Sequence, residues 1–428
     1  MLRKTLQWWR GQHVNSWIIF FVLIYFVLAL KVFTMEELDG NWFFGMYSVL
    51  VSLYLLSRFV LSYFYEPPTI KFDEGYEPTV SFGVPAKNEG ENIRETILRI
   101  ARSDYPKDKF DIIAVNDGSD DNTLQEMRAA KRIAAKEGIE VKVIDWKKNK
   151  GKRYGMAECV IQSDRDIIIF IDSDSFVEKD TTRQFVKYFI DGRIAAVAGH
   201  AYVANAEQNI LTKMQAIRYY ISFTVNKAAE ALFGSVTCCS GCCSAYRRVY
   251  ITRILDPWLH QRFLGVECTY GDDRSLTNFL LYKGYNCIFA PDAIAHTFVP
   301  DTLNKFLKQQ LRWKKSWVRE SLLACTFMWK RNPIMSVSFY LGVALPLLSP
   351  IVAARALLWM PLIRGRTPLF YIFGLGLMML VSGIYYYART GDRKWFYGVF
   401  SSTFYAILLV WQLPYAILNL RDSRWGTR

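Results

Sequence analysis

Two aspartates separated by a single residue are the first side chains in this sequence that could do chemistry. Asp172 and Asp174 flank Ser173 directly after the mostly apolar stretch 166–171. Carboxylates at this spacing can hold a divalent ion and a ribose hydroxyl, and an oxygen-ligated Mg²⁺ or Mn²⁺ ion neutralises a diphosphate. The pattern therefore indicates a site for a nucleotide diphosphate.

Another aspartate, Asp117, lies in the polar turn 116–121 that follows the short apolar stretch 111–115. Its carboxylate could accept a hydrogen bond from a base or a ribose. Asp and Gly also favour turns for purely local reasons, so turn formation is the competing interpretation. The position of the turn, some 55 residues before Asp172, strengthens the nucleotide interpretation.

A pair of adjacent carboxylates, Asp272 and Asp273, follows Tyr270 and Gly271. A sugar transfer that inverts the anomeric centre needs one carboxylate to take a proton from the attacking hydroxyl. We expect Asp273 to be this base, with Asp272 as the alternative. Asp272 could also cap a helix that starts before Ser275, and a cap would hold the neighbouring base in place.

A basic amphipathic segment near position 310 carries Gln309, Arg312 and Trp313. It could simply be a helix that lies on a membrane surface. Arg312 could instead grip a leaving diphosphate while Trp313 stacks on a sugar ring. Both interpretations are compatible, because a surface helix could roof an active site.

The elements that must position these residues alternate between strands and helices. Strands are expected at 79–84, 111–115, 140–144 and 166–171, with helical stretches between them. Such alternation predicts a parallel α/β sheet. Ligands bind at the carboxyl edge of open α/β sheets, which is where Asp117 and Asp172 would lie.

Long apolar runs at both ends of the chain predict membrane helices. Each run is long enough to cross a hydrocarbon core of about 30 Å. A cleaved signal peptide is the alternative for the first run, but no small-residue cleavage site stands out. The runs cover residues 17–33, 43–65, 333–363, 368–388 and 395–420.

The net charge of +14 suits a membrane protein with basic residues on its cytosolic side better than a nucleic-acid-binding protein. Arg3, Lys4 and Arg10 precede the first run and place the N-terminus inside. Two crossings then return the middle of the chain to the cytosol, and we expect no nucleic-acid partner.

The stretch 333–363 could cross once or form a hairpin of two short helices that breaks at 345–350. The hairpin gives four C-terminal crossings, and it places 364–366 and the basic tail inside and 389–394 outside. Of the eight basic residues in these segments, the hairpin puts five inside and a single span puts three inside. The positive-inside rule therefore favours the hairpin.

Eight cysteines are present, four of them between Cys238 and Cys243. A cytosolic domain keeps them reduced, and their spacing differs from that of the usual zinc sites. We expect small buried thiols that line a pocket. His296 could bind the metal, but a structural role is expected for it.

Together these motifs resemble the family 2 processive glycosyltransferases, and hyaluronan synthases most of all. The resemblance extends over almost the whole chain and ends in the tetrapeptide 425–428, which is similar to the gating loop of hyaluronan synthases. It implies a GT-A-like cytosolic α/β domain combined with transmembrane and interfacial helices. It also implies alternating transfer from UDP-GlcNAc and UDP-GlcA with Mg²⁺ or Mn²⁺, and a polysaccharide that leaves through the chain's own membrane helices.

The resemblance also implies roles for individual residues. Asp273 and Asp272 are the catalytic candidates and Asp174 is the metal ligand. The acceptor candidates are Cys239, Ser240, Gly241, Arg247 and Trp313. The residues expected to bind the nucleotide sugar are Pro85, Glu89, Asp117, Lys152, Arg153, Asp172, Gln309, Arg312, Trp425, Thr427 and Arg428.

The expected organisation is a multi-pass plasma-membrane protein that functions as a single chain in the lipid bilayer. Residues 1–65 would form two crossings, 66–300 the catalytic domain with an interface helix near 207–235, 301–332 a second interface helix, 333–420 the C-terminal crossings and 421–428 the gating tail.

Departures from the family pattern leave the product open. Lys87 replaces a common aromatic residue, and Cys242 and Cys243 replace an expected Pro-Leu pair. A chitin or chitooligosaccharide synthase that uses only UDP-GlcNAc is the alternative. A transferase that adds one sugar to a lipid phosphate, or a transporter with an inert nucleotide-sugar domain, would fit the motifs less well.

Overall fold

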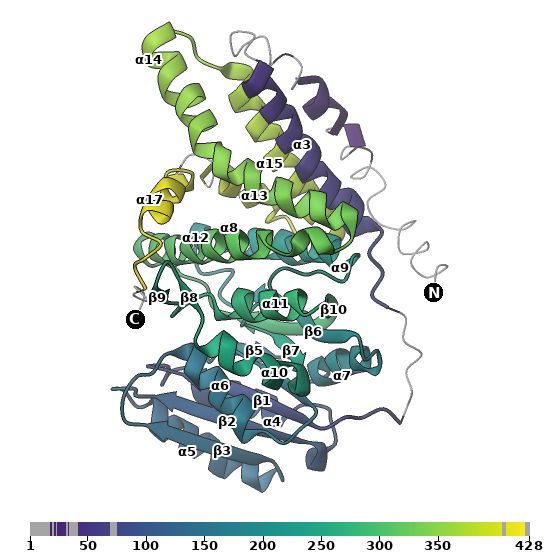
Figure 1. Cartoon of the computed structure of the whole chain (residues 1–428), viewed down its shortest axis with the longest axis vertical. Helices are drawn as coiled ribbons and strands as arrows, with labels where there is room; N and C mark the ends of the chain where they lie inside the picture. Colours follow the sequence, from purple (N-terminus) through teal and green to yellow (C-terminus); the bar gives the residue numbers. More distant parts are fainter. Residues whose placement is uncertain are drawn as a thin grey trace.

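The computed structural model describes residues 18, 21–22, 24–30, 33, 42–68, 75–404 and 408–423. They form three layers (Figure 1): an α/β domain, a layer of helices lying across it, and a group of long helices beyond that layer. The middle layer is the only one that contacts both of the others in this view. It therefore decides how the sheet is placed relative to the apolar helices.

The α/β domain is built on an eight-stranded sheet with the order β3-β2-β1-β4-β7-β6-β10-β5. The strands predicted from the sequence are confirmed as β1 to β4, which are parallel to their neighbours in this group. Strand β7 runs antiparallel to both β4 and β6, and β5 runs antiparallel to β10, so the sheet is mixed and not fully parallel. The strands are β1 (Val80–Ala86), β2 (Phe110–Asp117), β3 (Glu140–Trp146), β4 (Ile167–Phe170), β5 (Ser175–Val177), β6 (Ile194–Val203), β7 (Ser244–Arg247) and β10 (Asn286–Thr297), with β8 (Arg262–Phe263) and β9 (Val266–Glu267) in a separate two-stranded sheet.

Helices cover both faces of the sheet, and each face has its own apolar core. Every residue of β1 is buried, as expected for a central strand with helices on both sides. Gly83 in this strand faces the Phe170 ring so closely that an added Cβ would lie 2.8 Å from it. One face is covered by α4 (Ile93–Ala101), α5 (Thr123–Lys136) and α7 (Thr181–Val186), and the other by α6 (Lys152–Gln162), α10 (Arg248–Leu259) and α11 (Asp272–Tyr282).

The middle layer contains α8 (Ile210–Ile221), the π-helical segment η3 (Ser222–Lys227), α9 (Ala228–Ala231) and α12 (Leu303–Cys325). Helix α8 starts with a capping box in which Asn209 and Thr212 satisfy each other's backbone N–H groups. Helix α12 buries polar residues such as Gln310 and Glu320 together with apolar ones, so it is packed on both sides.

Three helices in the described part of the chain are long and apolar enough to cross a membrane: α3 (Trp42–Tyr63), the helix Pro333–Arg364 and α15 (Leu369–Thr390). Of the predicted first crossing, 17–33, the structure describes residues 18, 21–22, 24–30 and 33, and all of these are helical. Val27 is described, and it packs in one apolar cluster with Leu56 and Phe59 of α3.

The predicted hairpin at 345–350 is wrong, because Pro333–Arg364 is one helix of 32 residues. It consists of α13 (Pro333–Ala354), the π-helical segment η5 (Arg355–Trp359) and α14 (Met360–Arg364). Pro346 and Pro350 lie within α13 and do not end it. Apolar helices tolerate proline when neighbouring groups satisfy the freed backbone carbonyls. The carbonyl of Pro346 is the one that Pro350 leaves free, and it accepts a hydrogen bond from the Ser349 hydroxyl at 2.8 Å.

The last apolar run, 395–420, forms no long helix in the described residues. Helix α16 (Trp395–Phe404) packs against α8 and α15, and α17 (Gln412–Leu418) packs against α12. The chain thus leaves the domain along 333–364 and returns along 369–390 (Figure 1). Among the described C-terminal residues, two helices are thus long and apolar enough to cross, where four crossings were expected. Lys394, which follows α15, pairs with Glu207 and lies on the side of the sheet domain.

This course of the chain can be tested by cysteine labelling in intact cells. Thr367 and Arg393 are both exposed, near opposite ends of α15. We expect Thr367→Cys to react with a membrane-impermeant maleimide in intact cells, and Arg393→Cys to react only after permeabilisation. The unsubstituted chain provides the background labelling of the natural cysteines. The reverse pattern would support the hairpin topology instead.

Candidate active site

A cavity of about 1740 Å³ begins at the carboxyl edge of the sheet and continues between the apolar helices. Its lining brings together most of the residues that the sequence singled out, from segments far apart in the chain. They are Pro85, Asp117, Lys152, Asp172, Asp174, Ser240, Gly241, Asp272, Asp273, Gln309, Arg312 and Trp313. The sheet edge, the middle layer and the long apolar helices therefore share one continuous cavity.

Asp117 ends β2 and holds the backbone of the loop that leads into α6. Its Oδ1 accepts a hydrogen bond from the Lys150 N–H at 2.6 Å, and its Oδ2 accepts one from the Gly151 N–H at 2.9 Å. Burial raises the pKa of Asp117, against the opposing effect of these two hydrogen bonds. The next residue, Gly118, has a φ of +62°, and an added Cβ would lie 2.6 Å from the Asn149 nitrogen. A side chain at position 118 would thus push the loop off Asp117.

Asp172 and Asp174 follow β4 and are half-buried at the cavity wall. The Lys152 ammonium group contacts Asp172, and although burial alone would lower the pKa of Lys152, Asp172 raises it above its ordinary value. No group of three or more His, Cys, Asp or Glu side chains suited to a metal is found in the described part of the chain. Mg²⁺ and Mn²⁺ sites often use one or two carboxylates and take the rest of their oxygens from substrate phosphates and water. Asp172 and Asp174 fit that kind of site.

Asp273 lies at the N-terminus of α11, where the helix dipole favours a negative charge. Its Oδ1 accepts a hydrogen bond from the Arg274 N–H at 2.8 Å, while its Oδ2 lies 3.4 Å from the Gly241 nitrogen and 3.5 Å from the Cys238 sulfur. The carboxylate is half-buried and faces the cavity. It is therefore held in place and still open to a substrate hydroxyl.

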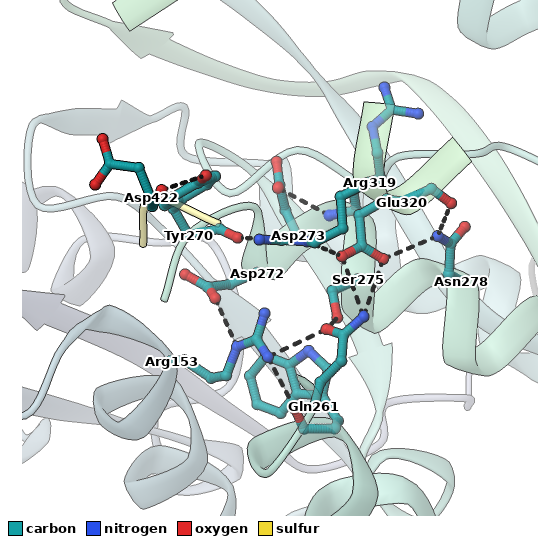
Figure 2. A network of polar contacts seen from close by, with 12 residues as sticks. Arg153, Gln261, Tyr270, Asp272, Asp273, Ser275, Asn278, Arg319, Glu320 and Asp422 are labelled. Atoms are coloured by element: carbon teal, nitrogen blue, oxygen red, sulfur yellow. Dashed lines mark hydrogen bonds and ion pairs between the residues drawn. The ribbon is translucent and has the colours of Figure 1, made fainter. Parts of the chain in front are cut away.

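Asp272 points away from this position and forms a buried ion pair with Arg153 at 2.7 Å (Figure 2). Both side chains are only 3% exposed. Arg153 also donates to the Trp258 carbonyl at 3.0 Å and to Gln261 Oε1 at 3.2 Å. Arg153 does not line the cavity. Its predicted contact with the nucleotide sugar is therefore corrected to a place in this buried ion pair. Asp272 is likewise a poor candidate base, because its charge is neutralised by Arg153, and the N-cap of α11 is Gly271.

The polar network continues from Gln261 into α12 (Figure 2). Gln261 donates to Glu320, which also accepts a hydrogen bond from Asn278 of α11 at 3.2 Å. Arg319 pairs with Glu320 at 2.8 Å and contacts the Tyr270 carbonyl. The network ties α6, α11 and α12 together around the start of α11.

The C-terminal end of the described chain reaches the same place. The Tyr270 hydroxyl donates to the Asp422 carbonyl at 3.0 Å, Lys315 of α12 pairs with Asp422 at 2.9 Å, and Thr269 contacts the Ser423 carbonyl. Ser423 lines the cavity. The predicted gating residues Trp425, Thr427 and Arg428 lie outside the described residues.

Gln309, Arg312 and Trp313 lie on one face of α12 and line the cavity, as their spacing of three and four residues requires. The Trp313 side chain is 40% exposed, and its ring centroid lies 6.4 Å from that of Tyr219 on α8. Gln309 has a buried Oε1 atom with no hydrogen-bond partner among the described residues. This face of α12 thus forms a polar and aromatic wall.

Arg247 is not near the candidate acceptor region. Because β7 runs antiparallel to β4, Ser244 pairs with Phe170 near the metal motif and Arg247 pairs with Ile167 at the other end. The Arg247 guanidinium contacts the Phe189 carbonyl there. The predicted roles of Arg247 in acceptor binding and in selecting a glucuronate are therefore wrong.

Two further predicted residues lie outside the cavity lining among the described residues. Cys239 is buried, and its N–H donates to Thr277 Oγ1 at 3.0 Å, so it supports the loop that carries Ser240 and Gly241. Glu89 precedes α4, and its N–H donates to Thr123 Oγ1 at 2.8 Å. His296, considered as a metal ligand, lies 3.0 Å from Glu178 and does not line the cavity.

Sequence reasoning missed Lys227. This residue ends η3, is 7% exposed, and donates to the Cys238 carbonyl at 2.8 Å and to Ser240 Oγ at 2.6 Å. It places a buried positive charge beside the loop 238–243 and lines the cavity. The available signal was a lysine that follows the aromatic and β-branched stretch 219–225.

The buried ion pair yields a stability prediction. Replacing Arg153 by Met leaves the Asp272 charge buried without its partner, which we expect to cost about 3–5 kcal/mol. Thermal unfolding of the purified protein would measure the loss. The surface ion pair of Arg99 and Glu95 offers a matched control, because Arg99→Met should cost no more than about 1 kcal/mol. Equal melting temperatures for the two variants would contradict the proposed importance of the pair.

Known proteins resemble this chain over much of its length. The family model described as glycosyl transferase family 2 matches residues 81–255. The chain is 30% identical to a hyaluronan synthase of Streptococcus pyogenes over 413 residues, which cover 94% of this chain and 95% of that protein. It is also 30% identical to an N-acetylglucosaminyltransferase of Azorhizobium caulinodans over 357 residues, covering 82% and 87% of the two chains.

A solved structure shows the same fold. The mannosyltransferase of Pyrobaculum calidifontis, in complex with GDP-Man and Mn²⁺, superposes with a TM-score of 0.61 at 20% identity, covering 89% of this chain and 99% of that one. The likeness supports a GT-A-like sheet domain that carries apolar helices. By its sequence relatives, and with the carboxylates gathered at one sheet edge, the chain belongs to the family 2 glycosyltransferases.

Proposed function

We propose that the chain polymerises hyaluronan from UDP-GlcNAc and UDP-GlcA at the cytosolic face and moves the growing polysaccharide across the membrane. The observation that carries this proposal is the continuity of one cavity. Its lining runs from Asp172 and Asp273 to residues of α3, α13 and α15 such as Tyr47, Ser349 and Tyr371. A transferase that released each product to the cytosol would have no need of this connection.

In the proposed reaction, the acceptor hydroxyl attacks the anomeric carbon of the donor, and the bond from that carbon to the diphosphate oxygen breaks. Asp273 takes the proton of the hydroxyl as its oxygen forms the new glycosidic bond, and UDP leaves with the electron pair. Contacts with the Gly241 and Arg274 backbone hold the Asp273 carboxylate for this step. Attack opposite the leaving group inverts the anomeric configuration.

The leaving diphosphate needs positive charge near it. When bound by Asp174 and Asp172, Mg²⁺ or Mn²⁺ would supply part of that charge. Lys152 and Arg312 line the same cavity and can supply more through charge-assisted hydrogen bonds. Asp117, together with the 149–151 loop that it holds, would border the nucleoside, and Trp313 offers a ring on which an acceptor sugar can stack.

The alternative product is a chitooligosaccharide made from UDP-GlcNAc alone, since an N-acetylglucosaminyltransferase is as similar to the chain as a hyaluronan synthase is. Lys87 and Cys242, which depart from the family pattern, both line the cavity and could affect which of the two products is made. The greater coverage of the hyaluronan synthases and the basic lining of the cavity favour hyaluronan.

The choice of base predicts a large kinetic effect. We expect Asp273→Asn to lower the turnover of sugar transfer by about 10²–10⁴-fold, because the side chain keeps its size but cannot take a proton. Asp272→Asn serves as the comparison and should chiefly lower the melting temperature, since it weakens the pair with Arg153. Radiolabelled transfer and thermal unfolding on both proteins would measure this. Full activity of the Asp273→Asn variant would remove Asp273 from the mechanism.

The proposed product predicts a donor requirement. Purified protein in lipid nanodiscs with Mg²⁺ or Mn²⁺ should form long polymer only when UDP-GlcNAc and UDP-GlcA are both present. Hyaluronidase should then degrade the product, and chitinase should leave it intact. Polymer from UDP-GlcNAc alone, unchanged by UDP-GlcA and digested by chitinase, would show that the chitooligosaccharide alternative is correct.

A further inference from the structure

The membrane part of the cavity contains one charged side chain among its described residues. Helices α3, α13 and α15 line it with apolar, aromatic and hydroxyl side chains, and Arg58 of α3 is the exception. Arg58 lies five residues before the end of α3, about 8 Å along the helix axis from the side of the sheet domain. It therefore occupies the region where the site passes into the membrane helices.

Arg58 is buried and has few partners. The residue is only 4% exposed, and its Nε atom has no hydrogen-bond partner among the described residues. Its Nη2 contacts Ser338 Oγ of α13, and its guanidinium lies 5.1 Å from the centre of the Tyr54 ring. These contacts orient the guanidinium but do not neutralise it.

A carboxylate in the same part of the cavity, Glu230, already has other partners. Glu230 of α9 also lines the cavity and is close enough to influence Tyr54 electrostatically. Its carboxylate accepts hydrogen bonds from the Thr237 N–H at 2.8 Å and from the Thr237 hydroxyl at 3.1 Å. Within the described residues, no carboxylate forms an ion pair with Arg58.

A buried cation without an anion is costly, and such side chains inside membrane proteins usually face a cavity and mark the path of a substrate or an ion. Arginine remains charged in proteins, so deprotonation cannot remove the cost. Its planar fork matches a carboxylate in a bidentate arrangement. The missing partner of Arg58 should thus be an anion that enters the cavity.

We propose that Arg58, oriented by Ser338 and Tyr54, binds a carboxylate of the growing polymer as the polymer enters the membrane helices. This inference rests on the proposed function, because a polymer with a uronic acid in each repeat supplies such a carboxylate and a polymer of GlcNAc alone does not. The site distinguishes the two polymers after transfer, at a position separate from the donor pocket. It is a binding site for the product and takes no part in the chemistry.

Binding of defined oligosaccharides tests the proposal directly. Full-length protein in nanodiscs, cleared of any co-purified polymer, would be titrated with a hyaluronan octasaccharide and with a neutral N-acetylchitooligosaccharide of equal length. We expect the wild-type protein to bind the acidic oligosaccharide about tenfold more tightly than the neutral one, and Arg58→Gln to abolish this preference. Arg58→Lys should keep part of it, because it retains the charge and loses the bidentate geometry.

Arg364→Gln is the matched control. Arg364 is an exposed arginine at the far end of the same apolar layer and does not line the cavity, so its loss should leave the preference unchanged. Unchanged preference in Arg58→Gln would overturn the proposal. If Arg58→Gln does not fold, the binding preference of Arg58→Lys tests the proposal instead. An unchanged affinity of that variant for the acidic oligosaccharide would overturn the proposed bidentate contact.

The donor assay separates this inference from the proposed function. If the wild-type protein makes hyaluronan but shows no preference for the acidic oligosaccharide, the Arg58 site is wrong and the proposed function stands. If the protein makes polymer from UDP-GlcNAc alone, the proposed function itself fails.

Discussion

The buried ion pair between Arg153 and Asp272 is the interaction on which the geometry of the site depends. It joins the first turn of α6 to the first turn of α11, and these turns carry Lys152 and Asp273, the residues next to the pair in sequence. Arg153 and Asp272 are buried in this pair, and their neighbours Lys152 and Asp273 line the cavity. A charge pair at 3% exposure tolerates little displacement, because separating the charges leaves both of them buried and unpaired. The relative position of Lys152 and Asp273 is set in this way.

Helix α12 extends this constraint to the membrane helices. Its C-terminal half provides Arg319 and Glu320 to the buried network, and its N-terminal half presents Gln309 and Arg312 to the cavity. Close packing fixes its distance from α11, since a Cβ added to Gly271 would lie 1.9 Å from Ser316 Oγ. The wall of the cavity therefore moves with the base and not independently of it.

Helix α12 also holds the C-terminal segment. Lys315 pairs with Asp422, and Lys314 contacts the Leu409 carbonyl. Burial, aided by the nearby charge of Arg218, lowers the pKa of Lys314 to about 7. An amine that is partly neutral can lie against a backbone carbonyl in this half-buried place at little cost. The chain end is brought to Tyr270 by these contacts, from the same helix that forms the cavity wall.

The sequence predicts the strand-end carboxylates well for a physical reason. Apolar runs of strand length followed by polar turns are local signals, and the topology of a parallel sheet then brings Asp117 and Asp172 to one edge. The roles of Arg153 and Asp272 depend on which way each side chain turns, and this is decided by packing between helices distant in sequence. The predicted acceptor role of Arg247 was wrong for a similar reason, because the direction of β7 relative to β4 is a property of the whole sheet. The predicted hairpin at 345–350 was wrong because proline usually breaks a helix in a water-soluble protein, whereas a packed apolar helix tolerates it.

The arrangement of charge along the cavity gives a physical account of how one space could serve both transfer and passage. Basic side chains gather at the sheet edge and in the middle layer, including Lys152, Lys227 and Arg312, where a diphosphate must be bound firmly. Beyond them, the described lining of the membrane helices offers a single cation, Arg58, among hydroxyl and aromatic groups. A conducting path must bind its cargo strongly enough to admit it and weakly enough to release it. One cation at the entrance, followed by neutral walls, meets both conditions for a polymer that carries widely spaced negative charges.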